Sequence, residues 1–560
     1  MDHRRFSVRK FPVAAALLVL ACVAPPALAQ EVSLVSALAD GTQADRDCIP
    51  AAISYDGRFV AFFSDAKSLA GLVNPHVECY VKDRLTGDVE LVSRNAAGDA
   101  ANQDVREVRL SADGNFVVFS TSATNLDAAD TNGSIPDCYL YDRAEDSIEL
   151  VSLGPDGEVG DYESREPVVS ADGRFVAFTS YAHNFAADDD NDTYDVFLRD
   201  RYLGTTVTIS VTQDGHVGND QSHAADITSD GGLVVFQSVA HDLTDVRTTG
   251  YDVYVRDVAG GTTTLLTLEM DGTPAFNAVN PRCSADGSVV CFSSGDALLV
   301  PDDTNGAEDI FVLDRVAGTV ERVNVTTSGE QGGLSQFPTI SADGRFVGFW
   351  CGAFDPLDPL DRNYAPDGYA RDRLRGITFR VSVRDGGDQT NIVGVPAIVS
   401  GDGRSYLFGS PTDVAEEGDA NGHADVFVHE LAPTPATSSH YGSGFPGELG
   451  IPTLTVAADP VLGQPIDVTI GSSSPQWILG FLALGVTPIE VRGSWGGDLL
   501  VAPLTLIPVP VTPFGYTLHA QVPYDAAFWN FSAVLQCLEL DPGAAKGVSS
   551  TDGLELDFGY

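Results

Sequence analysis

One ten-residue pattern, ISADGRFVGF at residues 340–349, recurs seven times and constrains the fold more than any other feature of this sequence. The aspartates of the seven copies are Asp56, Asp113, Asp172, Asp230, Asp286, Asp343 and Asp402. Successive copies are separated by 57, 59, 58, 56, 57 and 59 residues. Such a regular period indicates stacked or ringed copies of one supersecondary unit. We number these units repeats 1 to 7.

Each repeat contains four short segments with the character of strands. In repeat 6 they read FPTIS, RFVGFWC, DGYARDR and TFRVSV, and Gly, Asp and Asn residues separate them. Alternating, aromatic-rich segments between such residues are typical of β-strands. No helical periodicity of useful length occurs between residues 30 and 431. The sequence therefore predicts an all-β chain whose seven four-stranded blades form a β-propeller.

The two ends of the repeat region predict how the ring closes. Repeat 7 stops after ADVFVHEL at residues 424–431 and lacks a fourth strand. The segment EVSLVSA at residues 31–37 has the pattern of that missing strand and precedes repeat 1. A ring closed in this way leaves few open sheet edges. We therefore expect residues 30–431 to form a seven-bladed propeller closed by the N-terminal strand.

The repeat resembles a known family. The turn S-A-D-G-R-F-V-A-F followed by D-V-F-V-R-D-R is similar to the TolB-type, WD-repeat-like propeller repeat of secreted bacterial proteins, over residues 31–431. The resemblance implies the fold and a binding or scaffolding role, sometimes beside a hydrolase domain. The Asp-Gly pair suits a left-handed turn, so we interpret the hairpin as architecture. We expect turn and ion-pair roles for Asp83-Arg84, Asp142-Arg143, Asp200-Arg201, Asp314-Arg315 and Asp372-Arg373.

The N-terminal residues predict export. Residues 1–29 combine a basic start, a short apolar run and Ala27-Leu28-Ala29, the pattern of a cleaved signal peptide. Lipidation at Cys22 is the alternative. No later stretch reaches the roughly 18 apolar residues of a membrane helix, so no transmembrane segment is expected. The predicted location is secreted or in the cell envelope, extracellular or periplasmic.

Charge and cysteine content exclude several classes. The chain is acidic, with a formal net charge of −47, and lacks the basic footprint that nucleic acid requires. It has eight cysteines and no C-x-x-C, which argues against a zinc or redox site. Cys283 with Cys291, and Cys48 with Cys79, are possible disulfides in an oxidising compartment. Buried free thiols are the alternative.

A metal-ligand pattern recurs in the long loops before the third strand of several repeats. Asp-x-Asn is followed four residues later by a further Asp, and such oxygen ligands suit Ca²⁺. The candidate ligands are Asp189, Asn191, Asp195, Asp303, Asn305, Asp309, Asp361, Asn363, Asp367, Asp419, Asn421 and Asp425. The alternative is that these residues form Asx-turns and cap the strand. Bound Ca²⁺ would fix loops, without implying catalysis.

The amino-acid composition changes after the repeats. Residues 432–440, APTPATSSH, predict a linker, and the apolar, Gly- and Pro-containing strands of residues 441–560 predict a C-terminal β-sandwich. This part resembles the terminal β-domain of secreted, repeat-bearing bacterial proteins, through G-S-G-x-P-G, L-Q-x-L-E-L-D-P-G-A and T-D-G-L-E-L. Surface attachment or export sorting is a hypothesis for it. Trp477, Trp495 and Trp529 could line a carbohydrate site or pack in the core.

Enzyme motifs are missing from the sequence. It has no G-x-S-x-G for a prolyl-peptidase-like hydrolase and no S-x-D-x-G-x-T-W boxes of a sialidase. We therefore predict a non-enzymatic binding scaffold for a protein or glycan ligand on the long-loop face. The alternatives are a carbohydrate- or peptide-active enzyme with its site at the channel, and a structural surface protein. A convergent carboxylate pair or arginine cluster at the channel would favour the enzyme, and a smooth or aromatic mouth the binder.

Overall fold

The structure is a computed structural model of the 560-residue chain. It describes residues 30–71, 76–352, 357, 365–383, 397–410, 421–431, 437–458, 460, 465–486, 488–493, 497–503, 505–521 and 532–557, so the predicted signal peptide lies outside the described residues. All regular elements in these ranges are β-strands, and none is a helix that could cross a membrane. The chain divides into two compact units. One is Gln30–Leu431, and the other includes Ala432–Tyr560.

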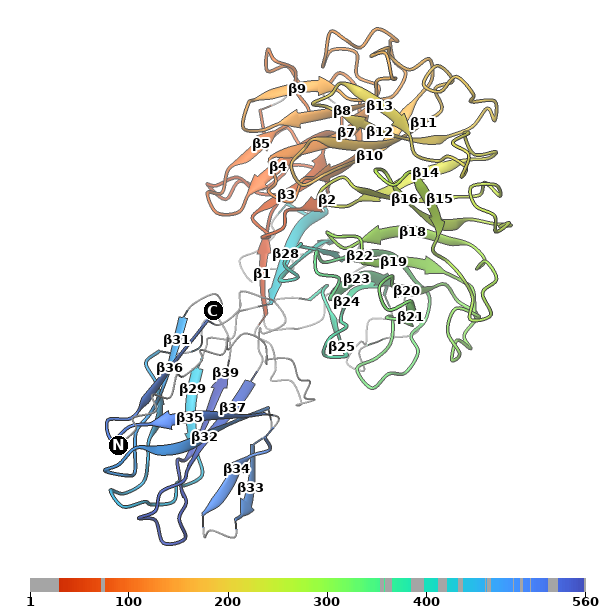
Figure 1. Cartoon of the computed structure of the whole chain (residues 1–560). Coiled ribbons are helices and arrows are strands. Elements are labelled where there is room, and N and C mark those ends of the chain that lie inside the picture. Colours follow the sequence, from red (N-terminus) through yellow and green to blue (C-terminus); the bar gives the residue numbers. More distant parts are fainter. Residues whose placement is uncertain are drawn as a thin grey trace, which may run out of the picture. The chain divides into compact units, whose positions relative to one another are not determined.

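The described part of the first unit consists of seven four-stranded antiparallel sheets (Figure 1). Repeat 1 contains β2 (Cys48–Ile53), β3 (Phe59–Ser64), β4 (Glu78–Asp83) and β5 (Val89–Leu91). Repeat 2 contains β6 (Val105–Leu110), β7 (Phe116–Thr121), β8 (Asp137–Asp142) and β9 (Ser147–Leu150). Repeat 3 contains β10 (Ser164–Val169), β11 (Phe175–Ser180), β12 (Asp195–Asp200) and β13 (Thr205–Thr208). Repeat 4 contains β14 (Ser222–Ile227), β15 (Leu233–Ser238), β16 (Asp252–Asp257) and β17 (Thr262–Leu265).

The remaining three sheets follow the same order along the chain. Repeat 5 contains β18 (Ala278–Cys283), β19 (Val289–Ser294), β20 (Asp309–Asp314) and β21 (Thr319–Arg322). Repeat 6 contains β22 (Ser335–Ile340), β23 (Phe346–Cys351), β24 (Asp367–Asp372) and β25 (Ile377–Arg380). Repeat 7 contains β26 (Ile398–Val399), β27 (Ser405–Ser410) and β28 (Asp425–Leu431). The N-terminal strand β1 (Gln30–Leu34) is the fourth strand of this last sheet.

The pairing of β1 with β28 joins the two ends of the repeat region. The register runs from Gln30 opposite Leu431 to Leu34 opposite Phe427, and Figure 1 shows the two strands side by side. This is the strand pairing that the sequence predicted. Repeats 1 and 7 also share a hydrophobic core, in which Val60 contacts a cluster containing Leu407 and Val428. Most other cores likewise lie between consecutive sheets.

The repeated turn is fixed by its own side chains. In repeat 3, Ser170 Oγ (2.7 Å) and Arg174 N (3.0 Å) donate hydrogen bonds to Asp172 Oδ1, and Phe175 N donates to Ser170 Oγ (3.0 Å). Gly173 has a φ of +70°, and a Cβ at this position would collide with the Phe116 ring of repeat 2. The turn therefore requires glycine both for its backbone conformation and for contact between repeats. The interpretation of the hairpin as architecture is confirmed.

Backbone hydrogen bonds connect the turns of neighbouring repeats. Between described residues, such bonds of 2.7–3.0 Å run from Tyr55 N to Ala112 O, from Ala171 N to Ser229 O, from Ser229 N to Ala285 O, from Ala285 N to Ala342 O, from Ala342 N to Gly401 O and from Asp402 N to Tyr55 O. The last of these bonds joins repeat 7 to repeat 1. The inner ends of the sheets are thus held at fixed spacing.

The Asp-Arg pairs after the third strands have the predicted roles. Asp83 binds Arg58 of its own turn, with Nη2 and Oδ2 2.7 Å apart. The arginine that follows such an aspartate reaches the preceding repeat: Arg143 Nε lies 2.9 Å from Glu90 Oε2, and its Nη1 donates to Gly114 O (2.8 Å). Arg84 binds Glu430 in the same way across the junction of repeats 1 and 7, at 2.8 Å. Ion pairs of this kind join repeats 7 and 1, 1 and 2, 2 and 3, and 5 and 6.

The predicted disulfides are not formed. All seven cysteines in the described residues are buried and free. In the β18–β19 pair, Cys283 lies opposite Val290 and Cys291 opposite Arg282, so the two thiols are not cross-strand partners. Burial raises the pKa of both thiols, and that of Cys291 to about 12. The alternative of buried free thiols describes this chain.

The second unit contains three sheets in its described residues. The largest has the order β29 (Thr437–Tyr441), β39 (Gly553–Asp557), β37 (Ser532–Glu539), β32 (Ile478–Gly485) and β35 (Thr505–Val511), with β38 (Ser549–Ser550) paired to β37. The second consists of β30 (Leu454–Val456), β31 (Pro465–Ile470) and β36 (Tyr516–Gln521). The third is the pair β33 (Pro488–Arg492) and β34 (Asp498–Val501). Trp477 is 73% exposed, so core packing does not describe it. Trp495 and Trp529 lie outside the described residues.

The turn glycines yield a prediction about stability. We expect Gly173→Ala to lower the free energy of unfolding by about 2–5 kcal/mol, because a left-handed backbone costs an L-residue about 1–2 kcal/mol and overpacking adds typically about 1–3 kcal/mol. Urea-induced unfolding of the purified protein measures this change. Gly215→Ala is the matched control, since Gly215 has a φ of +86° and a Cβ there would meet nothing within 4 Å. Equal losses in the two variants would contradict the inter-repeat contact.

Candidate functional site

A buried carboxylate begins the third strand of every repeat. We call this set the third-strand carboxylates. They are Glu78, Asp137, Asp195, Asp252, Asp309, Asp367 and Asp425. In repeat 3, Ser210 Oγ donates to Asp195 Oδ1 (2.7 Å) and accepts a hydrogen bond from Val196 N (3.0 Å). A Ser, Thr or Asn takes the place of Ser210 in the other repeats. These bonds join the third strand to the end of the fourth.

The asparagine of the predicted metal loops connects this carboxylate to the next segment of chain. Asn191 Nδ2 donates to Asp195 Oδ2 (3.0 Å) and to Gly218 O (2.7 Å), while its Oδ1 accepts from Thr193 N (2.9 Å). Asn305 in repeat 5 and Asn421 in repeat 7 have the same set of contacts. These are the contacts of the Asx-turn alternative.

Arginines neutralise the third-strand carboxylates of repeats 5 and 6. Arg322 Nη1 lies 3.7 Å from Asp303 Oδ1 and 3.9 Å from Asp309 Oδ2, and both carboxylates are buried. Arg380 Nη1 lies 3.7 Å from Asp367 Oδ2. A guanidinium therefore supplies positive charge in the place where these two loops would hold a cation. In repeat 3 the corresponding residue is Thr208, which carries no charge.

Of the twelve predicted ligands, Asp361, Asn363 and Asp419 lie outside the described residues. The structure brings Asp189, Asn191 and Asp195 together in one loop, and it does the same for Asp303, Asn305 and Asp309. Within the described ranges, no group of three or more His, Cys, Asp or Glu side chains has a geometry that could hold a metal ion. Calcium therefore stays a prediction, and the loop around Asp189 is a fully described candidate in which Thr208 stands in the place of the arginine.

A cavity of about 570 Å³ lies among the first strands of the seven sheets. Each of β2, β6, β10, β14, β18, β22 and β26 contributes to its wall, together with residues of the repeated turns. Most of the wall is apolar, and Tyr55, Phe63 and Phe337 add aromatic surface. All seven repeats bound this cavity, and we call it the channel site.

Bulges in the first strands shape the wall of the channel site. Glu107, Glu166, Asn280 and Phe337 all have φ between +54° and +55° and stand six residues before a turn aspartate. The amides of Glu166 and Asn280 donate hydrogen bonds to the preceding repeat. Glu166 N donates to Glu107 Oε2 (2.8 Å), and Asn280 N donates to Gln237 Oε1 (2.7 Å). Such left-handed backbone in bulky residues persists only where the surroundings enforce it, and it concentrates at functional sites.

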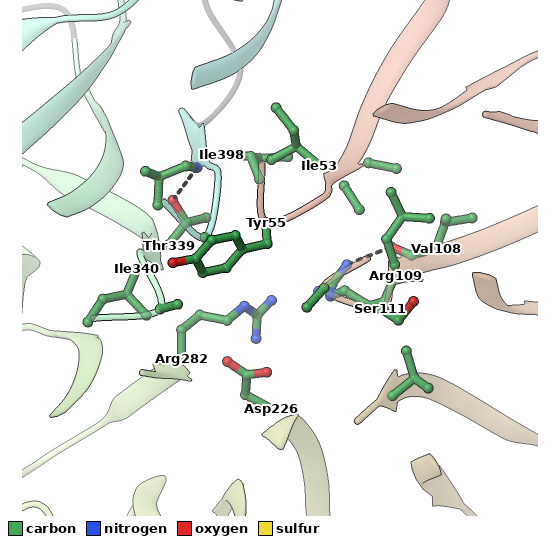
Figure 2. A pocket seen from close by; sticks show the side chains of 18 of the residues that line it. Ile53, Tyr55, Val108, Arg109, Ser111, Asp226, Arg282, Thr339, Ile340 and Ile398 are labelled. Carbon is green, nitrogen blue, oxygen red and sulfur yellow. Dashed lines mark hydrogen bonds between the residues drawn. The ribbon is translucent and has the colours of Figure 1, made fainter. Parts of the chain in front are cut away.

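Three charged side chains converge in the channel site. Arg109 from β6, Asp226 from β14 and Arg282 from β18 all stand four residues before a turn aspartate. Figure 2 shows Arg282 and Asp226 pointing toward one another, with the Tyr55 ring beside them and Arg109 on the β6 wall. Burial, helped by the like charge of Arg282, lowers the pKa of Arg109 to about 10. The guanidinium thus remains charged at neutral pH in an environment that disfavours charge.

Sequence reasoning missed this cluster, although a signal was present. At the same position the other repeats have Ala52, Val168, Thr339 and Ile398, so two arginines and one aspartate interrupt a small or apolar series. A register comparison of the seven copies would have singled them out. That they face one another required the circular arrangement of the sheets.

Comparisons with known proteins give fold resemblance only. No protein-family model matches the sequence, and the search of curated proteins found no match. Similar solved structures include the protein from Agrobacterium tumefaciens described as a TolB, with 17% identity and a TM-score of 0.34, covering 62% of this chain and 94% of that one. The WD40 repeats of RRP9 show 10% identity and a TM-score of 0.35, covering 72% and 100%. The chain thus has TolB-like and WD40 propellers among its structural neighbours.

An enzyme also appears among the similar structures. A puromycin-hydrolyzing peptidase of Mycobacterium tuberculosis shows 12% identity and a TM-score of 0.36, covering 67% of this chain and 52% of that one. The fold assignment itself rests on the repeated four-stranded sheets of this chain.

The third-strand carboxylates yield a prediction about pH. Burial raises the pKa of Asp252 from an ordinary value of 3.8 to about 7, and its Oδ2 has no hydrogen-bond partner among the described residues. Between these values the folded chain holds a proton that the unfolded chain releases, so this carboxyl lowers the free energy of unfolding as pH rises. We compare the free energy of unfolding of Asp252→Asn with that of the wild type at each pH. This difference should favour the variant by about 1–3 kcal/mol more at pH 8 than at pH 5, since one pKa unit corresponds to about 1.4 kcal/mol.

Urea unfolding at several pH values between 5 and 8 measures this effect. Asp245→Asn is the control, because Asp245 is exposed in the same repeat and the substitution makes the same change in net charge. A stability difference between Asp252→Asn and the wild type that does not vary with pH would show that Asp252 is already ionised in the folded protein at pH 5.

Proposed function

We propose that this protein is a secreted or envelope binding module without enzymatic activity, and that it takes a small ligand, or a protruding part of a larger one, in the channel site. In this proposal residues 30–431 form a closed seven-bladed propeller, the linker of residues 432–440 follows, and residues 441–560 form a β-sandwich. The single observation that carries the proposal is the 570 Å³ cavity to which all seven repeats contribute. Ligand sites in proteins are typically concave, mostly apolar and supplied with a few placed polar groups.

The walls of the channel site support binding because they are fixed in advance. The hydrogen bonds between turns set the spacing of the first strands, and the bulge amides are bonded to the neighbouring repeat. A preformed site loses little conformational entropy when a ligand enters, and that saving strengthens binding. The sequence predicted a ligand site on the long loops, whereas the cavity lies among the first strands of the sheets.

The enzyme alternative rests on one specific observation, the pair Arg109 and Arg282 in the channel site. Two features favour binding over catalysis. Asp226 accepts hydrogen bonds from Ile227 N (3.0 Å) and Cys283 N (2.9 Å), and Glu107 accepts from Ser120 Oγ (2.7 Å) and Glu166 N. The carboxylates of the described wall thus have structural partners. The Cys283 thiol is a poor nucleophile, because burial raises its pKa.

The repeats themselves suggest how to block the channel. In repeat 1 the residue before the turn aspartate is Tyr55, and it fits because its neighbour is Gly401, where a Cβ would collide with the Tyr55 ring. We expect the double variant Ala171→Tyr with Ala112→Gly to copy this arrangement and fill the cavity from a second side. Compounds that raise the melting temperature of the wild type in a thermal-shift screen of small acidic, neutral and basic molecules should not stabilise this variant.

The control for this screen is Leu85→Tyr, since Leu85 is 76% exposed and distant from the cavity wall. It should respond to each compound as the wild type does. Compounds that stabilise the blocked variant and the wild type equally would place the site elsewhere. Conversion of a bound compound, detected by mass spectrometry, would replace the binding proposal with the enzyme alternative.

We also propose that Ca²⁺ binds the loop of repeat 3 that contains Asp189. What supports this is the set of oxygen groups at Asp189, Asn191 and Asp195 and the uncharged Thr208 in the place of Arg322. Burial raises the pKa of Asp189, as it does for Asp195, whose pKa is about 7. A bound cation would favour the ionised form of both carboxyls and so stabilise the folded protein.

The test compares melting temperatures of the mature protein with Ca²⁺, with chelator and with NaCl of matched ionic strength. We expect Ca²⁺ to raise the melting temperature of the wild type and of Asp303→Asn, because repeat 5 already has its arginine, but not that of Asp189→Asn. Equal melting temperatures with Ca²⁺ and with chelator would contradict calcium binding and leave Asx-turns as the role of these loops.

A further inference from the structure

We infer that the channel site selects an organic oxyanion, a molecule with a carboxylate or phosphate group on an apolar body, and that Arg109 and Arg282 bind this group. The inference rests on the proposed binding function and adds the chemical class of the ligand.

Arg109 and Arg282 have more hydrogen-bond donors than the described part of the chain satisfies. A guanidinium carries five N–H donors and no acceptor. Arg109 uses only Nη1, which donates to Val108 O (3.0 Å). Arg282 also uses only Nη1, which donates to Ala225 O (2.7 Å) and Pro281 O (3.0 Å). The Nε and Nη2 donors of both side chains have no acceptor in the described part of the chain.

The acceptors of the wall do not offset these donors. Neither arginine forms an ion pair with a carboxylate of the described residues, although the arginines next to the turns do so in several repeats. Asp226 faces Arg282, but two backbone N–H groups already use part of the acceptor capacity of its carboxylate, so this one group cannot satisfy the free donors of both arginines. The cavity therefore has a surplus of donors, and a ligand rich in acceptor oxygens would satisfy them.

Electrostatics points to the same class of ligand. Burial and then the charge of Arg282 lower the pKa of Arg109, while the carboxylates of Asp226, Glu107 and Glu166 offset part of this effect, so the two guanidinium groups repel one another in a partly dehydrated space. An oxyanion between them would remove this repulsion and form charge-assisted hydrogen bonds, which for arginine and carboxylate or phosphate are often bidentate. The rest of the chain is strongly acidic, with a net charge of −47, so these arginines are a local exception.

The remainder of the wall defines the rest of the ligand. Ile53, Ile340, Ile398 and the Phe337 ring surround the charged groups with apolar surface. A free inorganic ion would leave this surface in contact with water. An apolar body attached to the anionic group would cover it, at about 25 cal/mol for each Å² of apolar surface removed from water.

Calorimetric titration with three probes tests the inference. The probes are benzoate, phenyl phosphate and the neutral benzyl alcohol. We expect benzoate, phenyl phosphate or both to bind the wild type saturably, and benzyl alcohol to bind at least tenfold more weakly. The better of the two anions identifies the carboxylate or the phosphate as the preferred group.

Variants connect the binding to the two arginines. Arg109→Gln and Arg282→Gln should each weaken anion binding at least tenfold, while Arg282→Lys should retain part of it because the charge remains and the planar fork is lost. Arg106→Gln is the matched control, an exposed arginine three residues earlier in β6, and it should bind as the wild type does. Circular dichroism and the melting temperature of each variant show that it is folded.

The outcomes separate this inference from the function on which it rests. Compounds that bind the wild type but not the blocked variant, and bind the Arg109 and Arg282 variants unchanged, would overturn the inference and leave the proposed function intact. Absence of saturable binding by both anions up to their solubility limits would also overturn the inference. Anion binding that survives in the blocked variant would overturn both.

Discussion

The backbone hydrogen bond between successive turns is the interaction on which the rest of this structure depends. At five junctions it links the residue before one turn aspartate to the corresponding residue of the next repeat, and the bond from Asp402 to Tyr55 links the last repeat to the first. Because the bond is formed by backbone atoms, its geometry is nearly independent of the side chain at each position. The side chains on the inner strands can therefore vary while their spacing around the channel stays constant. Arg109, Asp226 and Arg282 meet for this reason, although they come from three different repeats.

Charge is distributed through this scaffold in two ways. On the third strands, a carboxylate recurs in every repeat and is held by a hydroxyl or amide of the fourth strand. Arg322 and Arg380 neutralise it further in two repeats, and in repeat 4 the buried Asp252 has one oxygen without a partner. On the first strands, charged residues differ from repeat to repeat, and Arg109, Asp226 and Arg282 lie in the wall of the cavity. The carboxylates of the third strands recur in every repeat, whereas these three charges occur in repeats 2, 4 and 5.

The sequence predicted the parts of the structure that depend on local chemistry and on period. Asp56-Gly57 and its copies specify the turn through side-chain hydrogen bonds within six residues, so the turn could be predicted from sequence alone. The pairing of β1 with β28 followed from counting strands at the two ends. The choice between disulfides and buried free thiols stayed open in the sequence because it depended on register, and in the structure Cys283 faces Val290 and not Cys291. The loop around Asn191 was ambiguous for a physical reason, since an Asx-turn and a calcium loop require the same oxygen-bearing residues. The channel arginines could not be predicted as a cluster, because nothing within one repeat shows what lies across the ring.

The position of β1 has a consequence for how the chain reaches its folded state. Ser36, just after this strand, binds Asp425 across a separation of 389 residues. The fourth strand of the last sheet therefore precedes all seven repeats in the chain, yet it can dock only after every repeat has been synthesised. Contacts of such long range form slowly, since the entropy of closing the loop opposes them. Until β1 docks, β28 presents an open edge of the kind that pairs with strands of other molecules. The N-terminal strand β1 therefore completes the last sheet late in folding. Until then, β1 of a second copy of the chain competes with it for the open edge of β28.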